Sequence, residues 1–115
     1  MSGGQDKANK QRGEIAVDLN GEPVKLRLTV NSICELEELD GRSITEILEA
    51  VSQPNVKMLL LRKFFWALML DDNPDATLED AGKIVAALQG RHTEILADAV
   101  AMAFPEAQEG VGEGK

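Results

Sequence analysis

The sequence predicts an α+β fold, mostly α, in which an N-terminal β-hairpin is followed by four to five helices in a small bundle. Three observations favour it. Apolar and polar residues alternate over residues 14–28, which is typical of a half-buried hairpin. From residue 30 onward, apolar residues recur every three or four positions, as on one face of a helix. Leu and Ala also make up nearly a quarter of the 115 residues, which favours helix.

The hairpin has the clearest local pattern. Its apolar positions are Ile15, Val17, Leu19, Val24, Leu26 and Leu28. Between the two runs stands Asn20-Gly21, a pair favoured in tight hairpin turns because both residues tolerate a positive φ. Pro23 has no N–H group and is best placed beside the turn or on a sheet edge. Because an isolated two-stranded ribbon is marginally stable, we expect its apolar face to lie on helices or on another chain.

The helix boundaries follow from capping patterns. We expect the first helix to begin between Thr29 and Ser32 and to end at Gly41, and the second to open with the Ser43/Glu46 capping box and end at Gln53-Pro54. The remaining three are expected over Val56–Leu70 with Asn55 as its cap, from Thr77/Asp80 to Gly90, and from Thr93 to Pro105. Residues 13–105 then form one domain, and residues 1–12 and 106–115 are expected to be a disordered arm and tail.

The charge balance argues against nucleic-acid binding. The chain has 12 Lys and Arg against 20 Asp and Glu, for a net charge of −8, whereas a nucleic-acid binder needs a basic face to displace counterions from phosphates. A helix-turn-helix DNA-binding regulator is therefore disfavoured. An acidic surface favours solubility and basic partners. The acidic run Glu35–Asp40 is interpreted as the solvated face of a helix, with contact to a basic partner helix as the alternative.

Neither a secreted nor a membrane protein is expected. The N-terminus has no apolar run of the kind that a signal peptide needs. The longest apolar stretch is interrupted by Lys57, Arg62 and Lys63 and is shorter than the roughly 20 apolar residues that cross a bilayer. The one cysteine, Cys34, excludes an intramolecular disulfide and is interpreted as a small buried apolar residue. We expect a cytoplasmic protein.

The patterns of catalytic and metal sites are missing from the sequence, so we expect neither an enzyme nor a cofactor. Cys34 and His92 are more than fifty residues apart and do not have zinc-ligand spacing. Residues 71–75 imitate the start of an EF-hand loop, but Ala76 and Gly82 stand where that loop needs Gly and Glu. A phosphate-binding glycine loop and a nucleophile elbow are also missing.

The most distinctive apolar cluster is Phe64-Phe65-Trp66. Adjacent residues are about 100° apart around a helix, so these three cover most of its circumference. We favour enclosure of this helix by the hairpin and the other helices; the alternative is an exposed patch that binds a partner. The residues expected to form the packing and partner-contact surfaces are Met58, Leu61, Phe64, Phe65, Trp66 and Met69 of the helix, and Val17, Leu19, Val24 and Leu26 of the hairpin.

The order of three segments resembles a known family. Residues 12–21 read RGEIAVDLNG, residues 26–30 read LRLTV, and Glu35-Leu36-Glu37 follows. This arrangement is similar to the small tail proteins of gene transfer agents and related phages, which are described as tail tube proteins or tail assembly chaperones. The resemblance covers about residues 12–104, and the hairpin and first helix carry most of it.

The resemblance implies a role in building a phage-like tail. It implies a chaperone that coats the long helical tape measure protein in the cytoplasm of the bacterial host during tail morphogenesis of a phage, prophage or gene transfer agent. The chaperone would form homo-oligomers on assembly and give way to the tail tube protein. The alternative is a structural tail tube subunit retained in the particle. Neither role implies catalytic residues, a bound metal or an interaction with a membrane.

Overall fold

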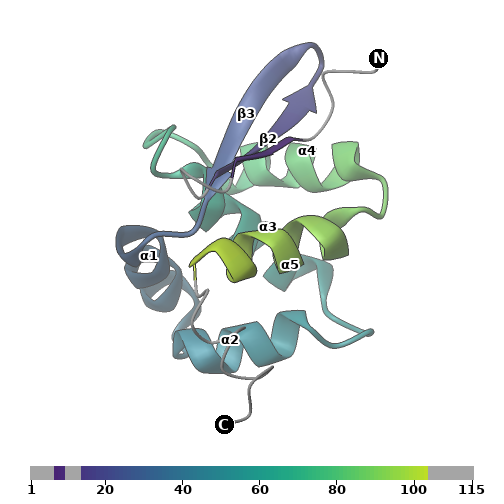
Figure 1. The fold of residues 1–115 in the computed structure, drawn as a ribbon. Helices are drawn as coiled ribbons and strands as arrows, with labels where there is room; N and C mark the ends of the chain where they lie inside the picture. Colours follow the sequence, from purple (N-terminus) through teal and green to yellow (C-terminus); the bar gives the residue numbers. More distant parts are fainter. Residues whose placement is uncertain (1–6, 10–13, 104–115) are drawn as a thin grey trace, which may run out of the picture.

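The computed structural model describes residues 7–9 and 14–103, and in this part of the chain five helices follow three short strands (Figure 1). The predicted α+β fold with an N-terminal hairpin and mostly helical remainder is therefore confirmed. No helix in the described part is both long and apolar enough to cross a membrane. The elements are β1 (Lys7–Asn9), β2 (Glu14–Leu19), β3 (Glu22–Arg27), α1 (Val30–Asp40), α2 (Ile44–Val51), α3 (Met58–Met69), α4 (Leu78–Leu88) and α5 (His92–Ala103).

The hairpin has the predicted turn. Strands β2 and β3 pair antiparallel, with Leu19 opposite Glu22. The two residues between them, Asn20 and Gly21, have φ angles of 53° and 87°, which is the left-handed conformation that a tight hairpin turn requires. Pro23 lies next to this turn on β3, an edge strand of the described sheet, where its missing N–H costs no sheet hydrogen bond.

Strand β1 was not predicted. Residues Lys7–Asn9 pair antiparallel with β2, so that Lys7 lies opposite Ala16 and Asn9 opposite Glu14. The expectation of a disordered arm is wrong for these three residues, because the free edge of β2 offers backbone groups that an extended segment can pair with. The rest of the arm, the predicted stop at Pro105 and the tail at 106–115 lie outside the described residues.

Most helix starts follow the capping patterns. Thr29 caps α1, and its hydroxyl oxygen accepts a hydrogen bond from the backbone N–H of Ser32. Complete capping boxes, in which cap and third residue bond reciprocally, open α2 at Ser43 and α4 at Thr77. These three predictions are confirmed, and in each a polar side chain satisfies backbone N–H groups that the first helical turn leaves without partners.

Helices α3 and α5 begin elsewhere than predicted. Asn55 does not cap α3, because the backbone N–H of Val56 bonds to Gln53 O in a turn that follows α2. The helix starts at Met58, and Lys57 is a cap without a side-chain hydrogen bond. Helix α5 starts at His92. Thr93, which was predicted to open this helix, is therefore its second residue.

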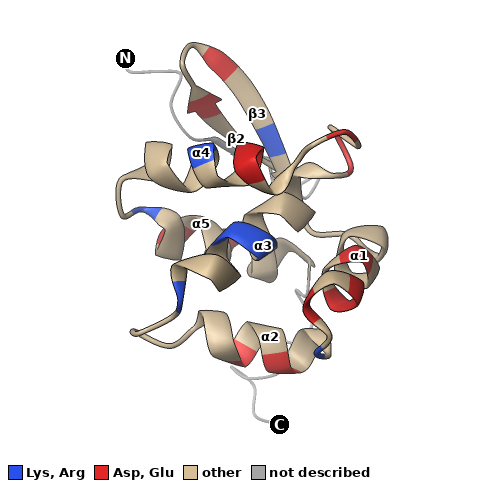
Figure 2. Cartoon of the chain, turned by 180° about the vertical axis from the view of Figure 1, so that it is seen from behind, with Lys and Arg blue, Asp and Glu red and all other residues tan. Residues whose placement is uncertain are grey.

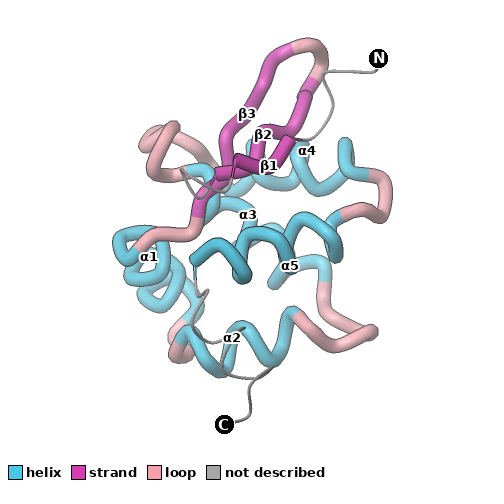
Figure 3. Tube along the Cα trace, in the orientation of Figure 1, coloured by secondary structure: helices cyan, strands magenta, loops and turns pink. Residues whose placement is uncertain are grey.

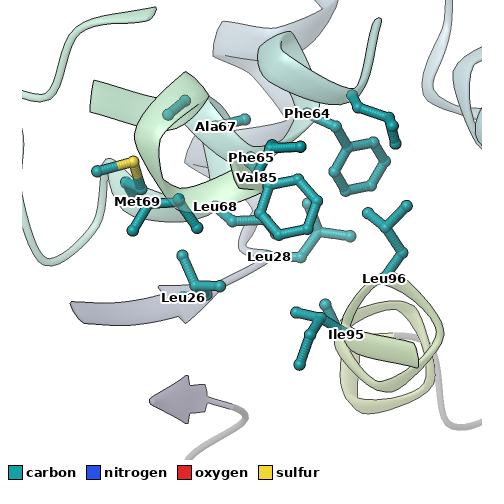
Figure 4. Packing of buried hydrophobic residues seen from close by; sticks show 14 of the residues in the cluster. Leu26, Leu28, Phe64, Phe65, Ala67, Leu68, Met69, Val85, Ile95 and Leu96 are labelled. Carbon is teal, nitrogen blue, oxygen red and sulfur yellow. The ribbon is translucent and has the colours of Figure 1, made fainter. Parts of the chain in front are cut away.

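Helix α3 lies at the centre of the domain (Figure 3). It contacts α1 and α4 as well as β3, while α5 packs across β2 and β3. Leu96 of α5 points toward the Phe64 ring, and Ile95 points toward Leu28, which follows β3 (Figure 4). The buried residues of α3 are Leu60, Leu61, Phe64, Phe65, Ala67, Leu68 and Met69. The core is therefore built around this one helix.

A polar network connects the hairpin to the loop after α3. The Glu14 carboxylate is nearly buried, and it accepts a hydrogen bond of 3.0 Å from Arg27 Nη2. Arg27 Nη1 also lies 3.5 Å from Asp71 Oδ2, and Thr29 Oγ1 donates a 3.0 Å hydrogen bond to Asp71 Oδ1. Asp71 belongs to the loop that imitates an EF-hand, and its carboxylate serves to fix the start of α1 against the end of α3.

The position of α3 predicts how two substitutions in it affect stability. Phe65→Ala removes a ring with no exposed surface and should lower the free energy of unfolding by about 3–5 kcal/mol, through lost burial and the cavity left behind. Met58→Ala, at a residue 63% exposed in the same helix, is the control and should change it by less than about 0.5 kcal/mol. Urea unfolding followed by circular dichroism measures both. Equal effects would mean that α3 is not enclosed as described.

Candidate functional site

The ten residues predicted as packing and contact surfaces do not form one exposed surface. Leu19, Val24 and Trp66 are half-buried against the core, and Met58 is exposed. The other six are core residues and are not accessible to a partner in this fold: Val17, Leu26, Leu61, Phe64, Phe65 and Met69. They serve packing, because the hairpin and α3 turn their apolar faces toward each other.

The aromatic cluster is enclosed, which is the interpretation that we favoured. Phe64 and Phe65 have no exposed surface. Trp66 is half-buried, and its indole N–H donates a 3.0 Å hydrogen bond to Ala76 O in the loop before α4. The alternative of an exposed aromatic patch is wrong for both phenylalanines, since elements that precede α3 in the sequence (β3 and α1) and one that follows it (α4) pack against it.

An open apolar groove of about 730 Å³ lies between α2 and α5, the helices labelled in Figures 1 and 3. Both helices and the segment after α2 contribute its walls. Its apolar lining consists of Ile44, Leu48 and Val51 of α2, Pro54 and Val56, and Leu96, Ala97, Val100 and Ala101 of α5; Thr45, Ser52, Gln53, His92 and Thr93 add polar groups. This groove is the candidate functional site.

The groove forms because each wall helix buries some of its apolar residues in the core and turns others toward the space between the two helices. On α2, Ile47 is fully buried in the core, whereas Leu48 is only half-buried and lines the groove. On α5, Ile95 is buried, whereas Val100 is half-buried and Ala97 is exposed within the groove. A helix whose apolar stripe is wider than the core contact leaves the remainder available to another molecule.

The wall helix α2 is held in place by polar contacts at its N-terminus. Of the other elements, α2 contacts α1 most. The backbone N–H of Ile44, the first residue of α2, donates a 2.7 Å hydrogen bond to Glu37 Oε2 of α1. The Asp40 carboxylate accepts hydrogen bonds from Arg42 Nε at 2.6 Å and from Lys63 Nζ of α3 at 3.1 Å. These carboxylates fix the α1–α2 connection, and through it the groove.

Two carboxylates of the acidic run are therefore not simply solvated. Glu35 and Glu38 are exposed, as expected, but Glu37 is half-buried and the Asp40 side chain is only 3% exposed. The hydrogen bond from Arg42, and then that from Lys63, hold the pKa of the Asp40 carboxyl below its ordinary value, although its burial acts in the opposite direction. Spacing alone did not reveal these roles because the partners lie beyond the helix.

Cys34 and His92 lie in different surroundings. Cys34 is exposed on α1, so its prediction as a buried residue is wrong. The buried face of that helix carries Ser32 and Leu36, and Cys34 lies on the side away from it. His92 is half-buried at the groove. Among the described residues, no three His, Cys, Asp or Glu side chains are close enough together to hold a metal ion.

Comparisons with known proteins add no further assignment. No family model, curated protein or solved structure matches the chain. The described residues that carry the sequence resemblance lie in β2, β3, α1 and the turns that join them, and none of them lines the groove. The groove is therefore the structural feature from which a function has to be argued.

Asp40 predicts a pH-dependent contribution to stability. Asp40→Asn should lower the free energy of unfolding at pH 7, because Arg42 and Lys63 lose an ionised partner. A carboxyl whose pKa is lowered by folding stabilises the fold above its unfolded-state pKa of about 4, and this stabilisation disappears as the pH falls through the folded-state value. The difference between the wild type and Asp40→Asn should therefore shrink below about pH 4.

Urea unfolding between neutral and acidic pH measures this difference. Asp72→Asn is the matched control, since Asp72 is exposed in the loop after α3, and it should change stability little at pH 7. A difference between the wild type and Asp40→Asn that stays constant across the whole range would contradict the assigned ionic role.

Proposed function

We propose that this protein is a tail assembly chaperone, which binds the tape measure protein during tail morphogenesis of a phage, prophage or gene transfer agent. The observation that carries the proposal is the open apolar groove between α2 and α5. The resemblance of residues 12–37 to small phage tail proteins supplies the biological setting. In this proposal the chaperone acts in the cytoplasm of the bacterial host.

A groove with two helical walls suits the recognition of a third helix. Amphipathic helices bind such sites by laying side chains at positions i, i+3, i+4 and i+7 along an apolar channel. Leu48 of one wall and Val100 of the other are half-buried and line this channel. A tape measure segment bound there would bury its own apolar stripe. A chaperone that keeps a long helical protein soluble has to shield such stripes from water.

Repetition along the tape measure would strengthen this interaction. Each site binds weakly when its contact area is small, but several copies on one long chain, with contacts between neighbouring copies, raise the overall affinity through effective concentration. Weak single contacts also allow release when tail tube subunits take over. This is why we expect homo-oligomers on the tape measure.

The alternative role, a tail tube subunit retained in the particle, has less structural support. A tube subunit needs enough strands to close a ring-forming sheet, whereas the described sheet has three strands, and β3 is one of its edges. That edge carries Pro23, which lacks an N–H, and the exposed Lys25. Both features discourage the addition of a further strand, so we prefer the chaperone.

Co-expression with the tape measure protein tests the proposal. The full chain should raise the soluble fraction of the tape measure and should co-elute with it in size exclusion, with several copies per tape. Ala97→Gln places a polar amide in the groove at an exposed position. Burying that amide against an apolar helix costs about 1–3 kcal/mol, so we expect about a tenfold or greater loss of co-eluting chaperone.

The matched control is Ala86→Gln, at an exposed position of α4 that does not line the groove. It should leave co-elution unchanged. A wild-type chain that neither solubilises nor accompanies the tape measure would overturn the proposed function. Detection of the protein in finished, purified particles would favour the tail tube subunit instead.

A further inference from the structure

The two helices that form the groove carry negative charge only. Helix α2 contains Glu46 and Glu49, and α5 contains Glu94 and Asp98; neither helix has a Lys or Arg. Figure 2 shows α2 with red segments and without blue ones. All four carboxylates are exposed. An apolar channel therefore runs between two acidic helices.

One carboxylate of each helix stands at the rim of the groove. Residues three and four apart in a helix are neighbours on its surface. Glu49 is four residues from Thr45 and three from Ser52, and both of these line the groove. On the opposite wall, Glu94 is three residues from Ala97, another lining residue. Glu49 and Glu94 therefore flank the apolar channel on its two sides.

Both rim carboxylates are available to a ligand. Within the described part of the chain, neither Glu49 nor Glu94 forms an ion pair or a side-chain hydrogen bond. Glu46 differs, because its carboxylate completes the capping box of α2. The side chains of the exposed acids at the rim thus make no specific contact within the described fold, in contrast to those of Glu37 and Asp40.

The charge pattern discriminates between possible occupants. A second copy that docked through the same groove would set the two rim carboxylates of one copy, Glu49 and Glu94, against the same two of the other. The chain's own residues 104–115 contain three Glu and one Lys, so they too have the same sign as the rim. Like charges brought together across an interface are unfavourable and exclude partners. A basic partner is the one that complements this site.

We propose that the groove binds an amphipathic α-helix of another protein, whose apolar stripe is flanked on both sides by Lys or Arg. The lining of α5 extends from His92 to Ala101, about 14 Å at 1.5 Å per residue, which accommodates about two and a half turns of such a helix. The apolar stripe fills the channel, and the flanking cations lie against Glu49 and Glu94. The proposal rests on the proposed function in one respect: it specifies the kind of tape measure segment that is bound.

Three synthetic helical peptides of about four turns test this inference on the full chain. They share one Leu stripe and differ in the flanking positions, which are all Lys, all Gln or all Glu. Calorimetry should give an affinity for the Lys peptide about tenfold higher than for the Gln peptide at about 50 mM NaCl, and the lowest affinity for the Glu peptide. At about 300 mM NaCl the three affinities should converge, because salt screens exposed charges.

Variants locate the effect at the rim. Glu49→Gln combined with Glu94→Gln should abolish the preference for the Lys peptide and leave binding of the Gln peptide unchanged. The matched control, Glu35→Gln combined with Glu79→Gln, removes two exposed acids from α1 and α4 and should retain the preference. Because the four positions are exposed, these variants should fold, and circular dichroism verifies that they do.

Several outcomes would overturn the inference: no binding of any peptide, equal binding of the Lys and Glu peptides, or a Lys preference that survives the rim variant. Its failure can be told apart from failure of the proposed function. A chain that co-elutes with the tape measure but does not discriminate the peptides keeps the function and loses this inference. A chain that binds the Lys peptide through the rim but ignores the tape measure does the reverse.

Discussion

Enclosure of helix α3 is the constraint on which the rest of the domain depends. Its Phe64, Phe65 and Leu68 have no exposed surface, and a twelve-residue helix with such a sequence needs cover on several sides. Helices α1 and α4 and strand β3 contact it. The hairpin, only marginally stable as an isolated ribbon, gains its stability by lying on α3 and under α5.

The same constraint explains why α2 is the element with a free apolar side. Helices α1 and α4 and strand β3 pack against α3, and α5 packs against the sheet, whereas α2 contacts chiefly α1. Its position is set by the polar contacts of Glu37 and Asp40 and by one deeply buried residue, Ile47. Polar contacts at one end of α2 and apolar contacts on one face leave the opposite side of its stripe open.

Local signals in the sequence predicted local structure well. The turn at Asn20-Gly21 and the capping boxes at Ser43 and Thr77 depend on neighbours within a few residues, and each was found where expected. Strand β1 escaped prediction because Lys-Ala-Asn has no alternating pattern of its own, and its pairing depends on the free edge of β2. The start of α3 was misplaced because a turn after α2 uses the backbone N–H of Val56.

The candidate groove could not be predicted from local sequence patterns. An apolar stripe shows that a helix is covered on that side but not what covers it, and for this reason Phe64 and Leu61 were included among contact residues when they are core residues. For α2 and α5 the reverse happened: none of their residues was included among the predicted contact residues, although both helices line the groove. The width of the stripe gave no warning either: Ile44, Ile47, Leu48 and Val51 span about 100° of α2, which is the ordinary width of a stripe that faces the core.

Sharing of residues between core and groove links binding to folding. Val51 and Leu96 are buried in the core cluster and also line the groove. A helix seated between α2 and α5 would further bury Leu48 and Val100, which the described fold leaves half-covered. Any molecule that binds only the folded chain stabilises it. Here the added stability would fall on α2, which contacts chiefly α1. If the groove binds a helix as proposed, its occupancy and the position of α2 would therefore be coupled, and the bound helix would complete packing that the described fold leaves open.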